Sequence, residues 1–204
     1  MSPWVRQSYK NVGGSCVLNT QSRSFTIALL LRDMVTGEDV SATSLHWSTA
    51  NGAGPDPACA SANASELDQI VRVHHGSVSL FIAGGDSNEP DLVTHDTTSA
   101  FRPWYGSMNF DLGGNLGWLD PMWRHCQTTG DVRACLVNQW TFRAALDRRI
   151  DFVFARRAPG AQPESLQAHT ITFNEAGDAN AALSGSDSVL PYSDHRAVWA
   201  RLRY

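Results

Sequence analysis

Two short apolar runs place the strongest constraint on how this 204-residue chain can fold. Residues 78–83 (VSLFIA) and 150–155 (IDFVFA) are almost continuously apolar, and Gly84 and Gly85 directly follow the first run. Runs of this length are typical of strands that are buried on both faces of a sheet. The sequence therefore predicts an α/β protein, and its length favours a single domain spanning residues 1–204.

Further strands are predicted on either side of these two runs. Apolar side chains alternate along residues 25–32 (FTIALLLR), and residues 40–46 (VSATSLH) follow turn-forming residues at 36–39. This pattern predicts a β-hairpin. Residues 169–173 and 197–202 are predicted to form the last two strands, separated by a connector rich in Gly, Asp, Ser and Asn.

The segments between the strands are predicted to be mainly irregular, with one helix. Residues 47–62 are rich in Gly, Pro, Ala and Ser, which predicts a long loop. Ser65 is suited to cap the N-terminus of a helix that continues through residues 66–75 and ends at Gly76. Residues 86–138 contain only short apolar pieces and are predicted to be mostly irregular.

The charge balance limits the classes of function. The chain has 16 basic and 20 acidic residues, a formal net charge of -4, which argues against the broad basic surface of a tight nucleic-acid-binding protein. A metal and a few arginines can still supply local positive charge for a polyanionic substrate. No apolar run reaches the roughly 18 residues of a membrane-spanning helix, and residues 1–10 contain no signal-peptide pattern.

The four cysteines do not have the spacing of a zinc site. Cys126 and Cys135 flank a short polar loop, which suits a local disulfide in an oxidising compartment. The alternative, that both are ordinary thiols, stays open from the sequence alone.

Polar residues that could carry chemistry cluster at the ends of predicted strands. His46 ends one strand, residues 85–88 (GDSN) follow the first apolar run, Asp151 lies at the start of the second, and residues 193–195 (SDH) precede the last strand. Each cluster alone is weak, because an Asp or Asn after a strand most often satisfies its own turn, and a His at a strand end is more often structural than catalytic.

The order of these clusters resembles the endonuclease/exonuclease/phosphatase superfamily. That superfamily includes pancreatic deoxyribonuclease, abasic-site endonucleases, inositol-polyphosphate phosphatases and neutral sphingomyelinases. The resemblance is carried by residues 44–47 (SLHW), 83–88 (AGGDSN), 149–154 (RIDFVF) and 193–195 (SDH), with Ser87 where the family often has an aromatic residue. It implies a four-layer α/β sandwich of two packed mixed β-sheets flanked by helices, and a metal-dependent phosphoesterase.

By this resemblance, His195 is the general base or the group that polarises the phosphate, and Asp151 accepts its ring N–H. For Asp151 the sequence also allows a structural ion pair with Arg148 or Arg149. Hydrolysis of a phosphate ester needs such a base, together with charge stabilisation on the phosphoryl oxygens.

The remaining roles implied by the resemblance surround the phosphate and the metal. Asp194 binds a divalent cation, Mg²⁺ with Mn²⁺ or Ca²⁺ as alternatives. Asp86 orients the attacking water or contributes to the metal site. Asn88 donates to the phosphate or joins the metal site, and His46 holds a phosphate oxygen opposite His195.

One expected metal ligand is missing. The family carries a Glu, usually in a Gln-Glu pair after an early strand, whereas the first Glu of this chain is Glu38, in the predicted hairpin turn. We therefore expect the fold to be N-terminally incomplete, without its first strand-helix-strand unit. Either the chain is a fragment, or it is a diverged, metal-poor remnant with impaired catalysis.

The leading expectation is a monomeric, extracytoplasmic phosphodiesterase. Residues 44–54 (SLHWSTANGAG) resemble the secreted, nuclease-like members, so DNA is the first expected substrate and a phospholipid headgroup, as in sphingomyelin or a phosphoinositide, the second. The rival expectation is a non-enzymatic domain that keeps the fold and has lost its metal.

Overall fold

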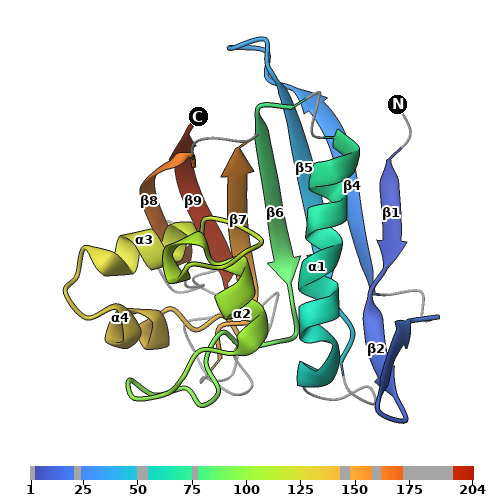
Figure 1. Ribbon diagram of the computed structural model, residues 1–204. Helices are drawn as coiled ribbons and strands as arrows, with labels where there is room; N and C mark the ends of the chain where they lie inside the picture. Colours follow the sequence, from blue (N-terminus) through green and yellow to red (C-terminus); the bar gives the residue numbers. More distant parts are fainter. Residues whose placement is uncertain are drawn as a thin grey trace, which may run out of the picture.

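The computed structural model describes residues 3–20, 24–49, 55–74, 78–142, 148–157, 162–171 and 195–204. Its centre is a five-stranded sheet in which β5 and β6 are parallel and all other neighbouring strands are antiparallel (Figure 1). The strands are, in spatial order, β1 (Trp4–Gln7), β4 (Phe25–Arg32), β5 (Asp39–His46), β6 (Leu80–Asp86) and β7 (Asp151–Arg157). The predicted hairpin and both predicted buried strands are confirmed.

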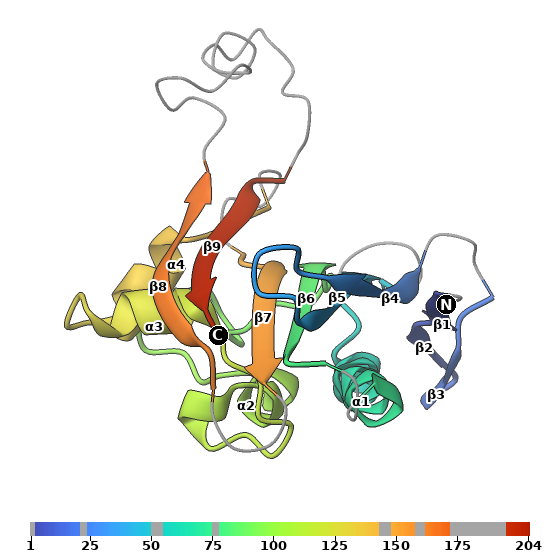
Figure 2. The ribbon, with the colours of Figure 1, turned by 90° about the horizontal axis from the view of Figure 1, so that it is seen from above.

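Helix α1 (Pro57–His74) connects β5 to β6 and covers one face of the sheet (Figures 1 and 2). The predicted loop over 47–62 is wrong from Pro57 onward, and the predicted helix cap at Ser65 is wrong. The helix begins at Pro57, a residue suited to the first helical turn, and Ser65 lies inside it, where its hydroxyl donates to the Ser61 carbonyl at 2.9 Å. The alanines of this segment favour a helix, and Gly76 lies outside the described residues.

The core lies between α1 and the sheet. Leu67 and Ile70 of α1 are fully buried and belong to the same apolar cluster as Phe81 of β6 and Phe152 and Phe154 of β7. Strand side chains alternate between the two faces, so the neighbours of these residues along β6 and β7 point to the opposite face.

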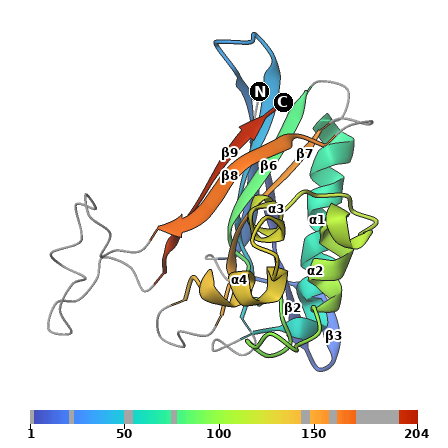
Figure 3. The same cartoon turned by 90° about the vertical axis from the view of Figure 1, so that its left-hand side faces the viewer.

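A second, two-stranded antiparallel sheet is formed by β8 (Glu164–Ile171) and β9 (Ala197–Arg203). Leu202 and Tyr204 at the end of β9 pack against Val40 and Leu80, on the face of the large sheet opposite α1 (Figure 3). The Tyr204 hydroxyl also donates a hydrogen bond to Asp33 in the β4–β5 turn. The molecule is thus a layered α/β protein, with a mixed sheet between helices and a further sheet, as predicted.

β9 covers only part of that face. Ile27, Leu29 and Leu31 alternate along β4 on the same face and remain 38–49% exposed. This row of exposed apolar side chains follows from the period-two pattern of the FTIALLLR segment. The alternate residues, Thr26 and Ala28, are buried toward α1.

Residues 86–138 are more regular than predicted. They contain α2 (Pro103–Met108), a short 3-10 turn η2 (Phe110–Leu112), α3 (Pro121–Gln127) and α4 (Val132–Asn138). These elements pack around the β7–β8–β9 side of the molecule (Figure 2). Asp120 and Asp131 cap α3 and α4 by accepting hydrogen bonds from the backbone N–H groups of Met122 and Ala134 at 2.9 and 3.0 Å. Each helix has only six or seven residues, too few to show a helical period of apolar side chains.

Two disulfides tie these elements together. Cys126–Cys135 joins α3 to α4 and confirms the favoured alternative of the sequence analysis. Cys16–Cys59, which was not predicted, joins α1 to β3 (Ser15–Leu18), the partner of β2 (Tyr9–Val12) in a small hairpin. Among the described helices, none combines the length and the apolar character that crossing a membrane requires.

Candidate active site

Three of the predicted site residues meet because their strands are in register. His46, the last residue of β5, pairs with Asp86, the last residue of β6, and Asp86 pairs with Asp151, the first residue of β7. Residues that are opposite each other in a sheet project from the same face. The three side chains therefore lie side by side at one end of the sheet, where the parallel strands β5 and β6 end.

Gly85 allows β5 and β6 to approach closely at this end. Its φ is 137°, and a Cβ atom on it would lie 2.1 Å from the carbonyl oxygen of Leu45. A larger residue would separate the two strands next to His46 and Asp86. With glycine in place, Nε2 of His46 lies 3.6 Å from Oδ2 of Asp86.

The turn after β6 is held by short hydrogen bonds. Asn88 has a φ of 54°, in the left-handed region that asparagine tolerates better than most residues. Its backbone N–H donates to Asp86 Oδ1 at 2.7 Å, and its side-chain amide donates to the Trp47 carbonyl at 2.8 Å. The Ser87 backbone N–H donates to the Ile150 carbonyl at 2.8 Å. These bonds connect the ends of β5, β6 and β7.

His195 reaches the site from just before β9. Its Nδ1 lies 2.8 Å from Oδ2 of Asp151, and its ring packs against Phe142, with ring centroids 5.2 Å apart. Of the partners that the sequence left open for Asp151, the structure shows this imidazole, while Arg149 pairs elsewhere. A carboxylate on Nδ1 fixes the ring orientation and favours the tautomer in which Nε2 accepts a proton.

The chain segments that carry Asp151 and His195 both form hydrogen bonds with Thr141, which is fully buried. Its Oγ1 accepts hydrogen bonds from the backbone N–H groups of Ile150 and Asp151, both at 3.0 Å. Its carbonyl accepts one from the backbone N–H of Arg196 at 2.7 Å. One residue therefore positions both chain segments that carry the His195–Asp151 pair. Sequence reasoning missed Thr141, because a single threonine outside any motif gives no signal.

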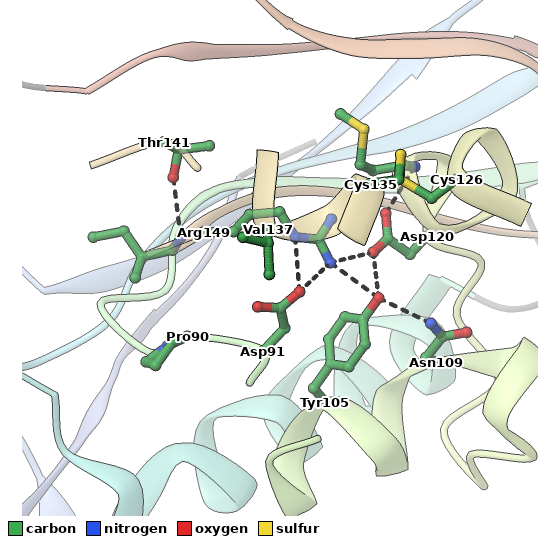
Figure 4. A network of polar contacts seen from close by, with 12 residues as sticks. Pro90, Asp91, Tyr105, Asn109, Asp120, Cys126, Cys135, Val137, Thr141 and Arg149 are labelled. Atoms are coloured by element: carbon green, nitrogen blue, oxygen red, sulfur yellow. Dashed lines mark hydrogen bonds and ion pairs between the residues drawn. A yellow bond between two sulfur atoms is a disulfide. The ribbon is translucent and has the colours of Figure 1, made fainter. Parts of the chain in front are cut away.

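Arg149, just before the first residue of β7, belongs to a buried network of charged side chains (Figure 4). Its guanidinium donates to Asp91 at 2.9 Å and to Asp120 at 2.7 Å, and the three side chains are each about 1% exposed. The Tyr105 hydroxyl donates to Asp120 at 2.5 Å and accepts from Arg149 at 3.0 Å. Since Tyr105 lies on α2 and Asp120 caps α3, the network ties both helices to the start of β7.

Asp86 carries a clear electrostatic perturbation. Burial, followed by the negative charge of Asp151, raises the pKa of Asp86 from 3.8 to about 6, while the Asn88 N–H and the two histidines oppose the increase. A hard divalent cation, which prefers oxygen ligands, would relieve this repulsion between carboxylates. One potential ligand atom from each of Asp86, Asp151 and His195 lies within 4.8 Å of the others. The two carboxylates and the imidazole therefore fit a divalent cation.

The structure brings together His46, Asp86, Asn88, Asp151 and His195. Asp194, the predicted metal ligand, lies outside the described residues and stays a prediction. Glu38 lies in the β4–β5 turn, at the opposite end of β5 from His46, so it takes no part in this site.

Solved structures with similar folds are known. An endonuclease/exonuclease/phosphatase from Bacteroides vulgatus matches 100% of this chain and 65% of its own, with a TM-score of 0.56 and 13% identity. The human Nocturnin catalytic domain with bound sulfate matches 84% of this chain and 52% of its own, with a TM-score of 0.51 and 13% identity. A humanized D. rerio TDP2 matches 88% and 61%, with a TM-score of 0.51 and 15% identity. Neither a family model nor a curated protein matches the sequence.

The chain therefore has the endonuclease/exonuclease/phosphatase fold that these structures share. It spans between about half and two thirds of the length of these three structures. At 13–15% identity the likeness establishes the fold, so the activity has to be argued from the site.

Proposed function

We propose that this protein is a metal-dependent hydrolase of phosphodiester bonds and that DNA is its substrate. The observation that carries the proposal is the His195–Asp151 pair at 2.8 Å, held next to the carboxylate of Asp86 at the end of the sheet. A base oriented by a carboxylate, beside a second carboxylate that can hold a metal, can activate water for attack on a phosphate.

His195 would remove a proton from the attacking water or polarise the phosphate through Nε2. Asp151, at 2.8 Å from Nδ1, would stabilise the imidazolium that forms. Asp86 would orient the water. The amide of Asn88 has a second hydrogen, besides the one donated to Trp47, with which it can bind a phosphate oxygen, and a protonated His46 can bind another.

Asp86 would hold the cation, with Asn88 and the predicted ligand Asp194 completing its protein contacts. When bound, Mg²⁺, Mn²⁺ or Ca²⁺ would stabilise negative charge on the phosphoryl oxygens. The net charge of -4 fits a site that obtains its positive charge locally.

The cellular setting is part of the same proposal. Two disulfides are typical of proteins that work in an oxidising environment, so we place the protein outside the cytoplasm. We expect it to act as a monomer, because the described residues of the proposed site, from His46 to His195, meet within a single chain.

Hydrolysis of plasmid DNA, sphingomyelin and a phosphoinositide, each with Mg²⁺ and with chelator, tests the proposal. We expect DNA cleavage with Mg²⁺ only, and losses of about 10²–10⁴-fold in His195→Ala and Asp86→Ala. His169→Ala is the matched control, because His169 packs against Trp199 outside the site.

Preferential hydrolysis of sphingomyelin would keep the phosphodiesterase and overturn DNA as its substrate. Release of inorganic phosphate from the phosphoinositide would overturn both, because that reaction breaks a phosphomonoester. If none of the three substrates is hydrolysed, or if both site variants keep wild-type rates, the catalytic assignment is wrong and the non-enzymatic alternative holds.

A further inference from the structure

A pocket of about 320 Å³ opens beside the candidate active site. Pro90 and Arg148 line it, and they belong to the chain segments that carry Asn88 and Asp151. The link to the site is also direct in space, since the backbone of Phe142 forms a β-bridge with Arg148 and another with His195. The volume lies at the lower end of the range for small-ligand pockets.

The charged residues lining the pocket are both basic. Arg102 and Arg148 contribute guanidinium groups, His95 contributes an imidazole, and no Asp or Glu is among the lining residues in the part of the chain that the structure describes. Arg102 makes two long contacts, from Nε to the Leu92 carbonyl at 3.4 Å and from Nη2 to the Val93 carbonyl at 3.3 Å. A guanidinium has five N–H donors, so these contacts orient Arg102 on the wall and leave donors for a ligand.

Two acidic groups lie behind the wall and oppose this charge only in part. Asp56 is 3% exposed and accepts a hydrogen bond from the Asn11 backbone N–H at 2.7 Å. Glu89 is 1% exposed, and burial raises its pKa to about 7 against the opposing effect of Arg102. Both carboxyl groups are buried, so the two guanidinium groups are the charged groups that the described lining presents to a ligand.

We propose that this pocket binds a phosphate group of a nucleic-acid strand, next to the phosphate that is hydrolysed, through Arg102 and Arg148. The inference rests on the proposed function and adds a second contact for the same substrate. Guanidinium groups recognise phosphate oxygens with paired N–H donors, and two of them line this pocket. A substrate with several phosphates should therefore bind more tightly than one with a single phosphate.

Binding of a labelled single-stranded oligonucleotide, measured by fluorescence anisotropy in chelator over a series of salt concentrations, tests this site without catalysis. We expect Arg102→Met and Arg148→Met each to raise the Kd about tenfold. Each variant should also reduce the slope of log affinity against log salt by about 0.7, the value for one phosphate contact on a single strand. Arg102→Lys should restore the slope, because the charge returns.

Arg203→Met is the control, since Arg203 pairs with Glu164 on the surface of the β8–β9 sheet, and it should leave the Kd and the slope unchanged. The assignment is overturned if both pocket variants, shown to be folded by circular dichroism, keep the wild-type Kd and slope. It is equally overturned if the variants lose binding to anionic phospholipid vesicles and keep binding to the oligonucleotide.

The two proposals fail separately. Intact Mg²⁺-dependent cleavage with unchanged binding in the pocket variants contradicts the pocket alone. Altered oligonucleotide binding in a protein that cleaves no phosphodiester contradicts the proposed function alone.

Discussion

At the scale of single residues, Thr141 fixes the geometry of the proposed catalytic pair, His195 and Asp151. Asp151 and His195 are 44 positions apart, and their contact depends on two backbone segments being held at one separation. The Thr141 hydroxyl holds the start of β7, and its carbonyl holds the residue after His195. Thr141 would therefore affect the reaction rate indirectly, by positioning Asp151 and His195.

Thr141→Val keeps the shape of the side chain and removes the acceptor for the Ile150 and Asp151 N–H groups. We expect kcat to fall about tenfold or more, and the free energy of unfolding to fall by about 1–3 kcal/mol because buried donors lose their partner. Thr141→Ser, which restores the hydroxyl, should recover kcat. Steady-state kinetics and urea unfolding measure both.

Thr170→Val is the control, since the Thr170 hydroxyl donates to Gln139 at 2.7 Å instead of holding the site. A similar loss of kcat in Thr170→Val, or a normal kcat in Thr141→Val, would show that Thr141 has no positioning role.

Glu89 makes a second residue-scale prediction, for stability against pH. Its folded-state pKa of about 7 lies above the ordinary 4.5, so the native state favours the protonated form and loses stability as pH rises from 4.5 through 7. Glu89→Gln should therefore stabilise the protein at pH 8 by on the order of 1–3 kcal/mol and have little effect at pH 4.5. Urea unfolding at the two pH values measures this, and an equal effect at both would contradict it.

At the scale of elements, sequence and structure agree best where the local pattern is strong. The strands β4, β5, β6 and β7 were predicted because alternating or continuous apolar runs have few other solutions. β1, WVRQ, and β2, YKNV, show no such pattern and form through pairing with distant residues. α1 was placed too late because Gly and Pro near its start outweighed its alanines in the prediction.

The disulfides yield a prediction at this scale, because they close loops of different length. Cys16 and Cys59 are 43 residues apart and join the β2–β3 hairpin to α1, whereas Cys126 and Cys135 are 9 apart within the α3–α4 unit. Loop-closure entropy predicts a loss of about 4 kcal/mol for Cys16→Ser with Cys59→Ser and about 3 kcal/mol for the other pair. Urea unfolding measures both, and a larger loss from the second pair would contradict this ordering.

For the whole molecule, the order of four short motifs predicted the fold although each motif alone is unspecific. The motifs also indicated the site, since strand register brings His46, Asp86 and Asp151 together. Thr141 and the Arg149–Asp91–Asp120 network could not be predicted, because contacts across 9 to 58 positions follow from packing and leave no local pattern.

A metal bound at Asp86 should stabilise the whole molecule. Mg²⁺ at 100 times its Kd adds about 2.7 kcal/mol to the free energy of unfolding if it binds only the native state. It also relieves the repulsion between Asp86 and Asp151. Thermal unfolding with Mg²⁺ and with chelator should differ for the wild type and coincide for Asp86→Asn; the same Mg²⁺ effect in both proteins would place the metal elsewhere.

The most direct measurement is the single-turnover rate of Mg²⁺-dependent DNA cleavage by the wild type, His195→Gln, Asp151→Asn and the double variant. We predict that His195→Gln slows cleavage about 10²–10⁴-fold. The double variant should be no slower than His195→Gln alone, because the two residues act as a unit. His169→Gln is the control and should cleave at the wild-type rate. Wild-type rates in both His195→Gln and Asp151→Asn would contradict the assignment of this site as the catalytic centre.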